Sequence, residues 1–424
     1  IVLITLDTLR RDYLSCYGYP HPTTPFLDRL AAGGVRFANA YSPSSWTVPS
    51  LVSLLSSLDP TTHGVNYGYT TDEQGVILDQ RPLGGELVLL PELLRRAGYR
   101  TLGVVASEHL QASLGFARGF DAYRCLGFVS GDRLQPALRQ LAAGVDRSRP
   151  FFLWVHYFDP HAPYDSDRPE LRDYLGGRER DPALLRRLQS FSAPEPFAAL
   201  DLEHEPDALP YVRASYASDV RQADDWVAAL FATFQLGADD LIVVASDHGE
   251  ELHEHGGFWH GHSLYDELLR VPLIVRLPAG RLAGRTVDTR VSLLDVLPTI
   301  LAAAGLEPAP SAQGRDLLPL AEGRRAEDAA IHATTGKIEE IEALLVGRFK
   351  YVRYLGSGRT LLFDLVDDPG ERHDLSRSRS AELAALHREL AELRMRRRPR
   401  IELQAASPMP PERIEALRSL GYLH

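Results

Sequence analysis

The segment most informative about the fold is Ile1-Val-Leu-Ile-Thr-Leu6, which is directly followed by Asp7. Its continuous apolar and β-branched character is typical of a strand that is buried on both faces. Two similar runs occur later, at Phe151–Tyr157 and 241–245, and segments with helical periodicity lie between the three. Strands that alternate with helices predict an α/β fold, in which a mainly parallel sheet is flanked by helices on both faces.

A different pattern begins near residue 331, where short strand-like segments are joined by tight turns. Three predicted strands and one predicted helix lie at 343–346, 351–354, 360–364 and 380–395. We therefore expect an α/β domain at 1–330 and a C-terminal α+β subdomain at 331–424, built from a small antiparallel sheet and a helix. The polar segment 165–210 interrupts the first domain, and we interpret it as an insertion over one rim of the sheet.

Composition and charge exclude several classes of protein. Apolar residues make up 44% and charged residues 24%, which is typical of a soluble globular protein. The 46 basic and 57 acidic residues give a net charge of −11, which argues against a nucleic-acid partner. Two cysteines are too few for a disulfide scaffold, and no apolar run reaches the roughly 18–20 residues of a membrane span. The sequence opens without Met, and we interpret it as a trimmed chain in which a signal or anchor would not be visible.

Polar side chains directly follow three of the predicted strands. These are Asp7, then Asp159 with His161, and then Asp247 with His248. In an open α/β sheet, ligands bind outside the carboxyl ends of the strands, where these residues are expected to meet. A carboxylate after a buried run is costly unless it is paired or bound to a cation, and mixed oxygen and nitrogen donors suit a divalent metal. The alternative is that each Asp caps the following helix.

Thr47 lies in Ser45-Trp-Thr-Val-Pro-Ser50, just before a helix that is predicted to begin at Pro49. Backbone N–H groups at a helix N-terminus favour an anion, and a Thr hydroxyl becomes a nucleophile once a metal or base activates it. This arrangement suits attack on a phosphate or sulfate centre. The alternative is that Thr47 is simply the N-cap of the helix.

A second group of polar residues is a histidine-rich segment. His253, His255, His260 and His262 fall within ten residues. They could form a metal-chelating loop or donate hydrogen bonds to phosphate oxygens, while His255 and His262 could instead brace the loop.

These motifs, in their order along the chain, resemble the sulfatase branch of the alkaline phosphatase superfamily. The matching segments are Leu6-Asp7-Thr8-Leu9-Arg10, Thr24-Pro25-Phe26-Leu27-Asp28, Gly34-Val35-Arg36-Phe37, Thr47-Val48-Pro49-Ser50, Asp159-Pro160-His161, Ser246-Asp247-His248-Gly249-Glu250 and Asp368-Pro369-Gly370-Glu371. Each motif is weak alone, but their order and spacing are specific to the family. Because a fold does not prove an activity, a folded protein without catalysis stays open as an alternative.

The chain also departs from this family. Sulfatases convert a Cys or Ser into formylglycine within a Cys/Ser-x-Pro-x-Arg motif, but here the first position is Thr47 and the last is Leu51. The family's sulfate-binding lysines are missing, because no Lys precedes Lys337, and His260 occupies one of their positions. The pattern instead resembles relatives with a Thr nucleophile, the lipid A phosphoethanolamine transferases and the lipoteichoic-acid synthases.

This resemblance implies a set of site residues and a cofactor. The implied metal ligands are Asp7, Thr47, Asp247 and His248. His161 and His260 match the residues that contact the transferred phosphate, and we add His262 as a further substrate contact. Thr8 stands where sulfatases have a second Asp, which weakens the case for an all-oxygen calcium site and favours zinc or manganese.

We therefore predict a metal-dependent hydrolase or transferase of phospho- or sulfo-esters with Thr47 as nucleophile. Because neither a Lys nor the family's Arg is expected beside the substrate, a monoanionic, phosphodiester-type substrate is favoured. The alternatives are a sulfatase without formylglycine, a catalytically dead binding protein, and a two-metal phosphodiesterase that adds Asp159, His255 and His262 to the ligands. The family implies an anionic ester substrate, linked to a lipid or glycan, and an exported or membrane-tethered protein.

Overall fold

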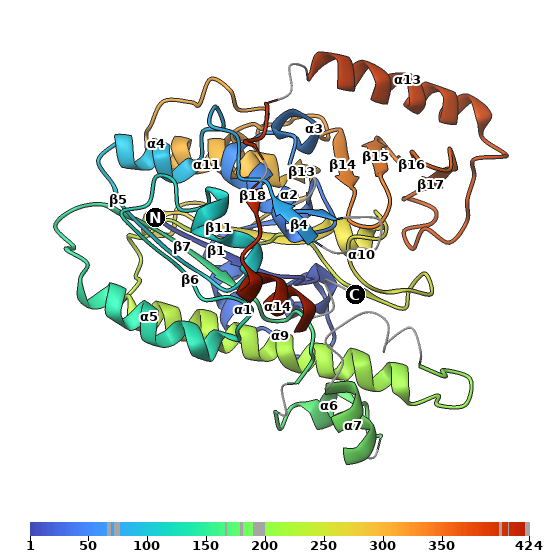
Figure 1. Ribbon diagram of the computed structural model, residues 1–424, viewed down its shortest axis with the longest axis horizontal. Coiled ribbons are helices and arrows are strands. Elements are labelled where there is room, and N and C mark those ends of the chain that lie inside the picture. The colour runs from blue at the N-terminus through green and yellow to red at the C-terminus, as the bar shows by residue number, and fades with distance from the viewer. Residues whose placement is uncertain are drawn as a thin grey trace.

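The fold is that of a computed structural model, which describes residues 1–65, 69–71, 77–165, 168–178, 181–189, 200–397, 401–405 and 407–419 (Figure 1). The strands of its largest sheet are, in spatial order, β12 (Arg285–Val287), β2 (Val35–Tyr41), β11 (Arg270–Arg276), β8 (Ile242–Ser246), β1 (Val2–Leu6), β7 (Phe151–Tyr157), β5 (Arg100–Val105) and β6 (Ala122–Cys125), with β13 (Val291–Ser292) beside β2. The five strands from β8 to β6 are parallel, whereas β11 is antiparallel to both of its neighbours. The prediction of a mainly parallel sheet is confirmed.

Strand register brings the predicted site residues to one edge of this sheet. Leu6, at the end of the central strand β1, pairs with Tyr157 on one side and with Ser246 on the other. The residues that follow these three strands therefore leave the sheet at the same level. Asp7 and Asp247 are adjacent for this reason, although 240 positions separate their strands' last paired residues.

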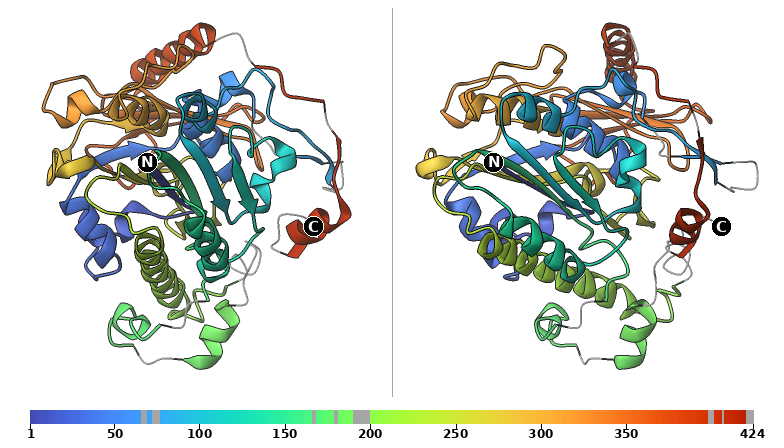
Figure 2. Two further views of the ribbon diagram at one scale, coloured as in Figure 1. Left: turned by 90° about the vertical axis from the view of Figure 1, so that its left-hand side faces the viewer. Right: turned by 60° about the vertical axis from the view of Figure 1, so that its left-hand side comes forward.

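Helices cover both faces of the sheet, as Figure 2 shows. One face is covered by α1 (Pro25–Ala32), α5 (Gly131–Ala143) and α9 (Ala208–Thr233), and the other by α2 (Thr47–Ser56), α4 (Leu90–Arg96) and α11 (Val296–Ala303). Successive residues of β1 point to opposite faces of the sheet, so Ile4 packs against the α1, α5 and α9 side and Leu3 against the α2, α4 and α11 side. Both faces of the strand are buried, which explains its uninterrupted apolar sequence.

Helix α2 begins earlier than the sequence indicates. Helix α2 starts at Thr47 and not at Pro49, because a Pro in the first turn lacks only an N–H that has no helical partner there. Trp46 is its extended N-cap residue, with φ −155° and ψ 162°. Helix α9 starts at Ala208, inside the predicted insertion, and its buried residues extend the core in that direction.

The C-terminal part confirms the predicted antiparallel sheet and helix. Its elements are β14 (Ile331–Thr335), β15 (Ile341–Val346), β16 (Phe349–Tyr354), β17 (Thr360–Asp364) and α13 (Ser380–Arg396). The first of these strands, β14, is missing from the sequence prediction. Figure 1 shows this sheet beside the main body, with α13 along its outer side.

Buried ion pairs join the C-terminal sheet to the main body. The ammonium of Lys350, on β16, lies 3.0 Å from Asp266 Oδ1 and 2.8 Å from Glu371 Oε1, and its side chain is fully buried. On the other side of the sheet, His332 Nδ1 of β14 lies 2.9 Å from Asp59 Oδ2, which also pairs with Arg397. Charges of the two parts of the chain therefore neutralise one another.

The predicted insertion at 165–210 is described in part, because 166–167, 179–180 and 190–199 lie outside the described residues. Its helices α6 (Leu171–Tyr174) and α7 (Pro182–Gln189) lie beside α9 (Figure 1). The remaining elements are β3 (Tyr69–Thr71), β4 (Ile77–Gln80) and β18 (Ser407–Pro408) in a small sheet, the pair β9 (Glu251–Leu252) and β10 (Phe258–Trp259), and the helices α3 (Pro60–His63), α10 (Asp266–Leu269), α12 (Leu318–Ala321) and α14 (Pro411–Ser419). Within the described part of the chain, no helix combines the length and apolar character that a membrane crossing requires.

Candidate active site

Three of the predicted metal ligands converge at the carboxyl ends of β1 and β8. His248 Nε2 lies 3.4 Å from Asp7 Oδ1 and 3.6 Å from Asp247 Oδ2. One ligand atom from each residue lies within 4.8 Å of the other two, and all three side chains are buried. The side chains therefore form a compact cluster of oxygen and nitrogen donors.

The chemistry of this cluster fits a divalent cation. Within the described part of the chain, neither Asp7 Oδ1 nor Asp247 Oδ2 has a hydrogen-bond partner, although both atoms are buried. Burial raises the pKa of Asp7 to about 8 and that of Asp247 well above its ordinary value. His248 Nδ1 lies 2.9 Å from the Gly249 carbonyl, which can only accept, so the neutral ring carries its proton there and offers a lone pair at Nε2. A mixed set of this kind suits zinc or manganese.

Thr47 joins the cluster from the first position of α2. Its Oγ1 lies 3.4 Å from His248 Nε2 and also hydrogen-bonds to Asp7. Ser50 Oγ donates to the Asp247 carbonyl at 2.6 Å, which fixes the start of the helix against the end of β8. The N-cap position belongs to Trp46, so the alternative reading of Thr47 as a helix cap does not hold.

Thr8 adopts a strained conformation directly after Asp7. Its φ of 56° lies in the left-handed region, which costs a β-branched residue roughly 1–3 kcal/mol. Tyr216 Oη donates to the Thr8 carbonyl at 2.7 Å and accepts from the Arg10 N–H at 2.8 Å, so α9 holds this turn. The Thr8 N–H points at Asp247 Oδ1, at 3.4 Å, and thereby links the two carboxylate-bearing strand ends.

His156, on β7, is a site residue that the sequence analysis missed. Trp154 Nε1 donates to Thr5 Oγ1 at 3.0 Å, and Thr5 Oγ1 lies 2.9 Å from His156 Nδ1. The Thr5 hydroxyl, which also lies 3.5 Å from the Val155 carbonyl, orients the ring through Nδ1, and His156 Nε2 lies 3.5 Å from Asp7 Oδ2. His156 thus faces the second oxygen of Asp7. The residue lies inside a fully buried apolar strand, where the sequence offers no signal that distinguishes it from a core histidine.

The two predicted phosphate-contacting histidines lie next to this cluster. The ring of His260 lies 4.5 Å from that of His248 and 5.1 Å from that of His161, between centroids. His161 Nδ1 donates to the Ala162 carbonyl at 2.7 Å, and His260 Nδ1 donates to Glu250 Oε1 at 2.9 Å. Burial lowers the pKa of both rings, that of His161 to about 3. Each neutral ring thus presents an accepting Nε2, and it can donate to a substrate oxygen only after it has taken up a proton as the anion binds.

The structure corrects the prediction that no lysine is available at the site. Lys337, in the loop between β14 and β15, places its Nζ 3.3 Å from His260 Nε2. Burial lowers the pKa of Lys337 to about 8, and the carboxylates of Glu250 and Asp7 act in the opposite direction. The count of lysines before residue 337 missed it because the contact joins residues 77 positions apart.

The remaining candidates of the sequence analysis are held by structural contacts. His262 Nε2 lies 2.7 Å from Glu251 Oε2, and His255 Nδ1 lies 2.7 Å from Glu267 Oε1. These contacts brace the loop that carries His260, although Glu251, His255 and Glu267 also form a second group with ligand geometry. The assignment of His262 as a substrate contact stays a prediction. Asp159, another candidate, accepts from Ser130 Oγ and from the N–H of Gly131 at the start of α5, so its carboxylate is used there.

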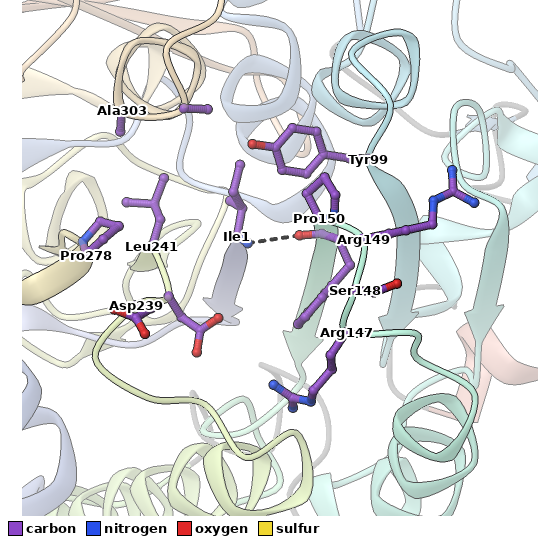
Figure 3. Close-up of a pocket in the computed structure, with 13 residues that line it drawn as sticks. Ile1, Tyr99, Arg147, Ser148, Arg149, Pro150, Asp239, Leu241, Pro278 and Ala303 are labelled. Carbon is purple, nitrogen blue, oxygen red and sulfur yellow. Dashed lines mark hydrogen bonds between the residues drawn. The ribbon is translucent and has the colours of Figure 1, made fainter.

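A pocket of about 350 Å³ lies at the opposite edge of the sheet, at the amino ends of β1 and β7 (Figure 3). Its lining includes Tyr99, Arg149 and Asp240. The Ile1 ammonium donates to the Phe151 carbonyl at its floor, at 2.9 Å. None of the site residues predicted from the sequence lines this pocket, so it is not a candidate for the active site despite its size.

Comparisons with known proteins agree with the fold. The sulfatase family model matches residues 1–306, and the model of the N-sulphoglucosamine sulphohydrolase C-terminal region matches residues 253–396. An uncharacterized sulfatase, YidJ, of Escherichia coli is 26% identical over 88% of this chain and 82% of its own length. A Δ4,5-hexuronate-2-O-sulfatase of Bacteroides thetaiotaomicron is 24% identical, with 92% of this chain and 87% of the relative covered.

Among solved structures, a phosphonate monoester hydrolase of Agrobacterium radiobacter has a similar fold. It superimposes with a TM-score of 0.74 and 21% identity over 97% of this chain and 99% of its own chain. The fold, the cluster at the strand ends and the family match over most of the sequence agree with one another. The chain belongs to the sulfatase family, within the alkaline phosphatase superfamily, and is a sulfatase-like hydrolase.

Proposed function

We propose that this protein hydrolyses a monoanionic phosphoester through a covalent intermediate on Thr47, with the metal held by Asp7, Thr47, Asp247 and His248. The observation that carries the proposal is the position of Thr47 Oγ1, in the first turn of α2 and within hydrogen-bond reach of His248 Nε2 and Asp7. A helix N-terminus, a hydroxyl and a set of metal ligands are what nucleophilic attack on phosphorus requires.

The residues of the site have separate roles in this reaction. A bound divalent metal would supply Lewis acidity and lower the pKa of the Thr47 hydroxyl. Thr47 Oγ1 forms a bond to phosphorus while the bond to the leaving oxygen breaks, and that oxygen takes up a proton. Water then cleaves the phospho-Thr47 ester and restores the hydroxyl. His161, once a bound anion has raised its pKa, holds a phosphate oxygen beside the ring of His260.

The charge at the site also supports a monoanionic substrate, but for a reason other than the absence of Lys and Arg on which the sequence analysis relied. A divalent ion and the ammonium of Lys337 bring three positive charges. Asp7 and Asp247 bring two negative charges once a metal is bound. Burial raises the pKa of Glu250 well above its ordinary value, so Glu250 brings a third charge only where Lys337 and the hydrogen bond from Tyr164 keep it ionised. The site is thus close to neutral before a substrate binds. A single negative charge disturbs this balance less than two do.

A comparison of substrates tests the reaction class. With matched aryl leaving groups, we expect kcat/KM for a phosphodiester to exceed that for a phosphate monoester and for a sulfate ester by about tenfold or more, which corresponds to ~1.4 kcal/mol. A phosphonate monoester, which carries the same charge as a diester, serves as the matched control. The fastest turnover on the monoester would contradict the charge argument and point to a second metal.

A sulfate ester is the second candidate, and the names of the relatives favour it. It carries the same single charge as a diester, so the electrostatics of the site do not exclude it. We rank it lower because formylglycine cannot form at Thr47. The fastest turnover on the sulfate ester would overturn our assignment in its favour.

We propose that the ester group is carried by a glycan or a lipid, since one relative is a hexuronate sulfatase. Export from the cytoplasm, transfer to an acceptor alcohol instead of water, and the role of 165–210 in substrate choice stay predictions. The same holds for the division of the chain at residue 330.

The stabilisation that a metal confers on the fold is expected to grow as the pH rises from about 6.5 to 8. Burial raises the pKa of Asp7 from 3.8 to about 8, so the metal-free folded protein binds a proton there that the unfolded chain has released. The contribution of Asp7 to the stability of the metal-free protein therefore falls as the pH rises from about 6.5 to 8. In the metal-loaded protein the cation takes the place of the proton, so this loss does not occur. Ionisable groups elsewhere contribute equally with and without metal.

Thermal unfolding of chelator-treated and of zinc- or manganese-loaded protein at pH 6.5 and pH 8 measures this effect. The difference in Tm between the two forms should be larger at pH 8. An equal difference at both values would show that no proton leaves Asp7 when the metal binds.

A further inference from the structure

Lys337 reaches the candidate active site from outside the main α/β body. It lies in the five-residue loop between β14 and β15, so it belongs to the C-terminal sheet. Its Nζ lies 3.3 Å from His260 Nε2 and 5.9 Å from the ring centroid of Trp46. Trp46 directly precedes Thr47, and the ring of His260 lies against that of His248. The ammonium therefore lies next to His260 at the edge of the candidate reaction centre, where burial raises the pKa of Asp7 and the charge of the ammonium lowers it.

The packing around this side chain is specific. Gly261 has a φ of +81°, and a Cβ at this position would lie 2.6 Å from Lys337 Cδ. A side chain at 261 would thus collide with the lysine stem. Thr335 Oγ1, at the end of β14, donates to the Gly261 carbonyl at 2.8 Å and ties the strand to the His260 loop. The stem of Lys337 therefore packs closely against the backbone at Gly261.

The hydrogen bonds of His260 determine which group can donate to an anion here. An ammonium group is only a donor, so His260 Nε2 accepts from Lys337. The ring therefore carries its proton on Nδ1, which donates to Glu250 Oε1, and Tyr164 Oη donates to the other oxygen of Glu250 at 3.1 Å. In this chain of contacts His260 has no proton left for a substrate, so the positive charge beside it is that of Lys337.

Electrostatic contacts orient the positive charge toward the site. Lys337 is attracted by the carboxylates of Glu250 and Asp7, and it acts as a positive neighbour on His161 and His248. A compact cation held at the edge of a buried site, next to a nucleophile, is suited to hold an anionic oxygen in the transition state.

We propose that Lys337 is an anion-binding residue of the active site, which holds an oxygen of the transferred group, and that His260 acts as a positioning residue for it. The inference rests on the proposed function for the identity of the anion, a phosphate or sulfate ester. It adds that the C-terminal sheet completes a site whose other residues lie in the α/β body.

The test compares Lys337→Met, which keeps the length of the side chain without its charge, with Lys337→Arg and with Ile338→Ala. Ile338 is 73% exposed in the same loop, so its variant controls for a disturbance of the loop itself. We expect Lys337→Met to lower kcat/KM at least 100-fold on the best ester and to weaken competitive inhibition by inorganic phosphate and by vanadate at least tenfold. Metal content should stay at the parent level, Lys337→Arg should regain at least tenfold in both measurements, and Ile338→Ala should match the parent.

Two results would overturn the assignment of Lys337. One is a Lys337→Met variant whose kcat/KM and inhibition constants stay within threefold of the parent. The other is a charge-independent loss, in which Lys337→Arg and Ile338→Ala fall as far as Lys337→Met. If the parent hydrolyses no ester of the panel, the proposed function fails separately. Calorimetric binding of inorganic phosphate and sulfate to the metal-loaded parent and to Lys337→Met then decides the role of the lysine, and equal binding or no binding to the parent rejects it.

Discussion

Thr47→Ala is expected to lower kcat by roughly 10⁴-fold or more while the fold and the bound metal are retained. The Thr47 hydroxyl lies within reach of both His248 Nε2 and Asp7. Thr47 is also the first residue of the helix whose N–H groups face the incoming anion. Alanine keeps the helix and removes the atom that would form the bond to phosphorus. Steady-state kinetics on the best ester, with circular dichroism and metal analysis of the same samples, measure the effect.

Two controls sharpen this experiment. Thr47→Ser keeps a hydroxyl at the same position and should retain far more activity than Thr47→Ala. Rapid quenching followed by mass spectrometry should find the transferred group on the peptide that contains residue 47 in the parent protein. A Thr47→Ala variant whose activity lies within about tenfold of the parent, a change of under ~1.4 kcal/mol in the barrier, would exclude Thr47 as the nucleophile.

Asp247→Asn and Asp247→Ala are expected to remove the metal and, with it, the activity. Purified parent protein should hold close to one equivalent of a divalent transition metal. The Asp247 carboxylate lies 3.6 Å from His248 Nε2 and its Oδ2 finds no hydrogen-bond partner among the residues that the structure describes, so a cation is the natural partner for it. Elemental analysis and a competition titration with a chromophoric chelator measure content and affinity.

A matched control for this experiment is Asp159→Asn. Asp159 is also a buried carboxylate near a strand end, but it accepts from Ser130 Oγ and the Gly131 N–H, so its loss should leave the metal in place. Retention of a full equivalent of metal by Asp247→Asn would reject the proposed ligand set. Two equivalents in the parent, one of which disappears in His255→Ala or His262→Ala, would favour the two-metal alternative.

Most of the architecture follows from local sequence patterns. The apolar run of β1 requires burial on both faces, and its register with β7 and β8 follows from parallel pairing, so Asp7 and Asp247 could be placed together without coordinates. The start of α2 was predicted two residues late, because Pro49 is compatible with several positions in a first turn. The error was small, but it concealed that Thr47 is itself helical.

The parts of the site that the sequence did not reveal depend on contacts between distant segments. His156 faces Asp7 because hydrogen bonds through Trp154 and Thr5 orient its ring, and a histidine inside an apolar strand gives no hint of such contacts. Lys337 reaches His260 across a boundary where we expected one domain to end. Sequence order predicts which residues leave a strand end together, but it does not predict which loop folds over them.

The buried ion pairs between the C-terminal sheet and the main body have a consequence for cooperativity. If the sheet detached, Asp266 would lose Lys350 and Asp59 would lose His332, and the apolar contacts of Tyr41, Leu264 and Leu269 with the sheet would be lost at the same time. Because a folded protein is typically only about 5–15 kcal/mol more stable than its unfolded chain, the loss of these contacts together would remove a large share of that stability. The two parts of the chain are therefore expected to melt in one transition. A destabilising substitution far out on the C-terminal sheet would then lower the melting temperature of the whole protein, including the part that carries the metal ligands.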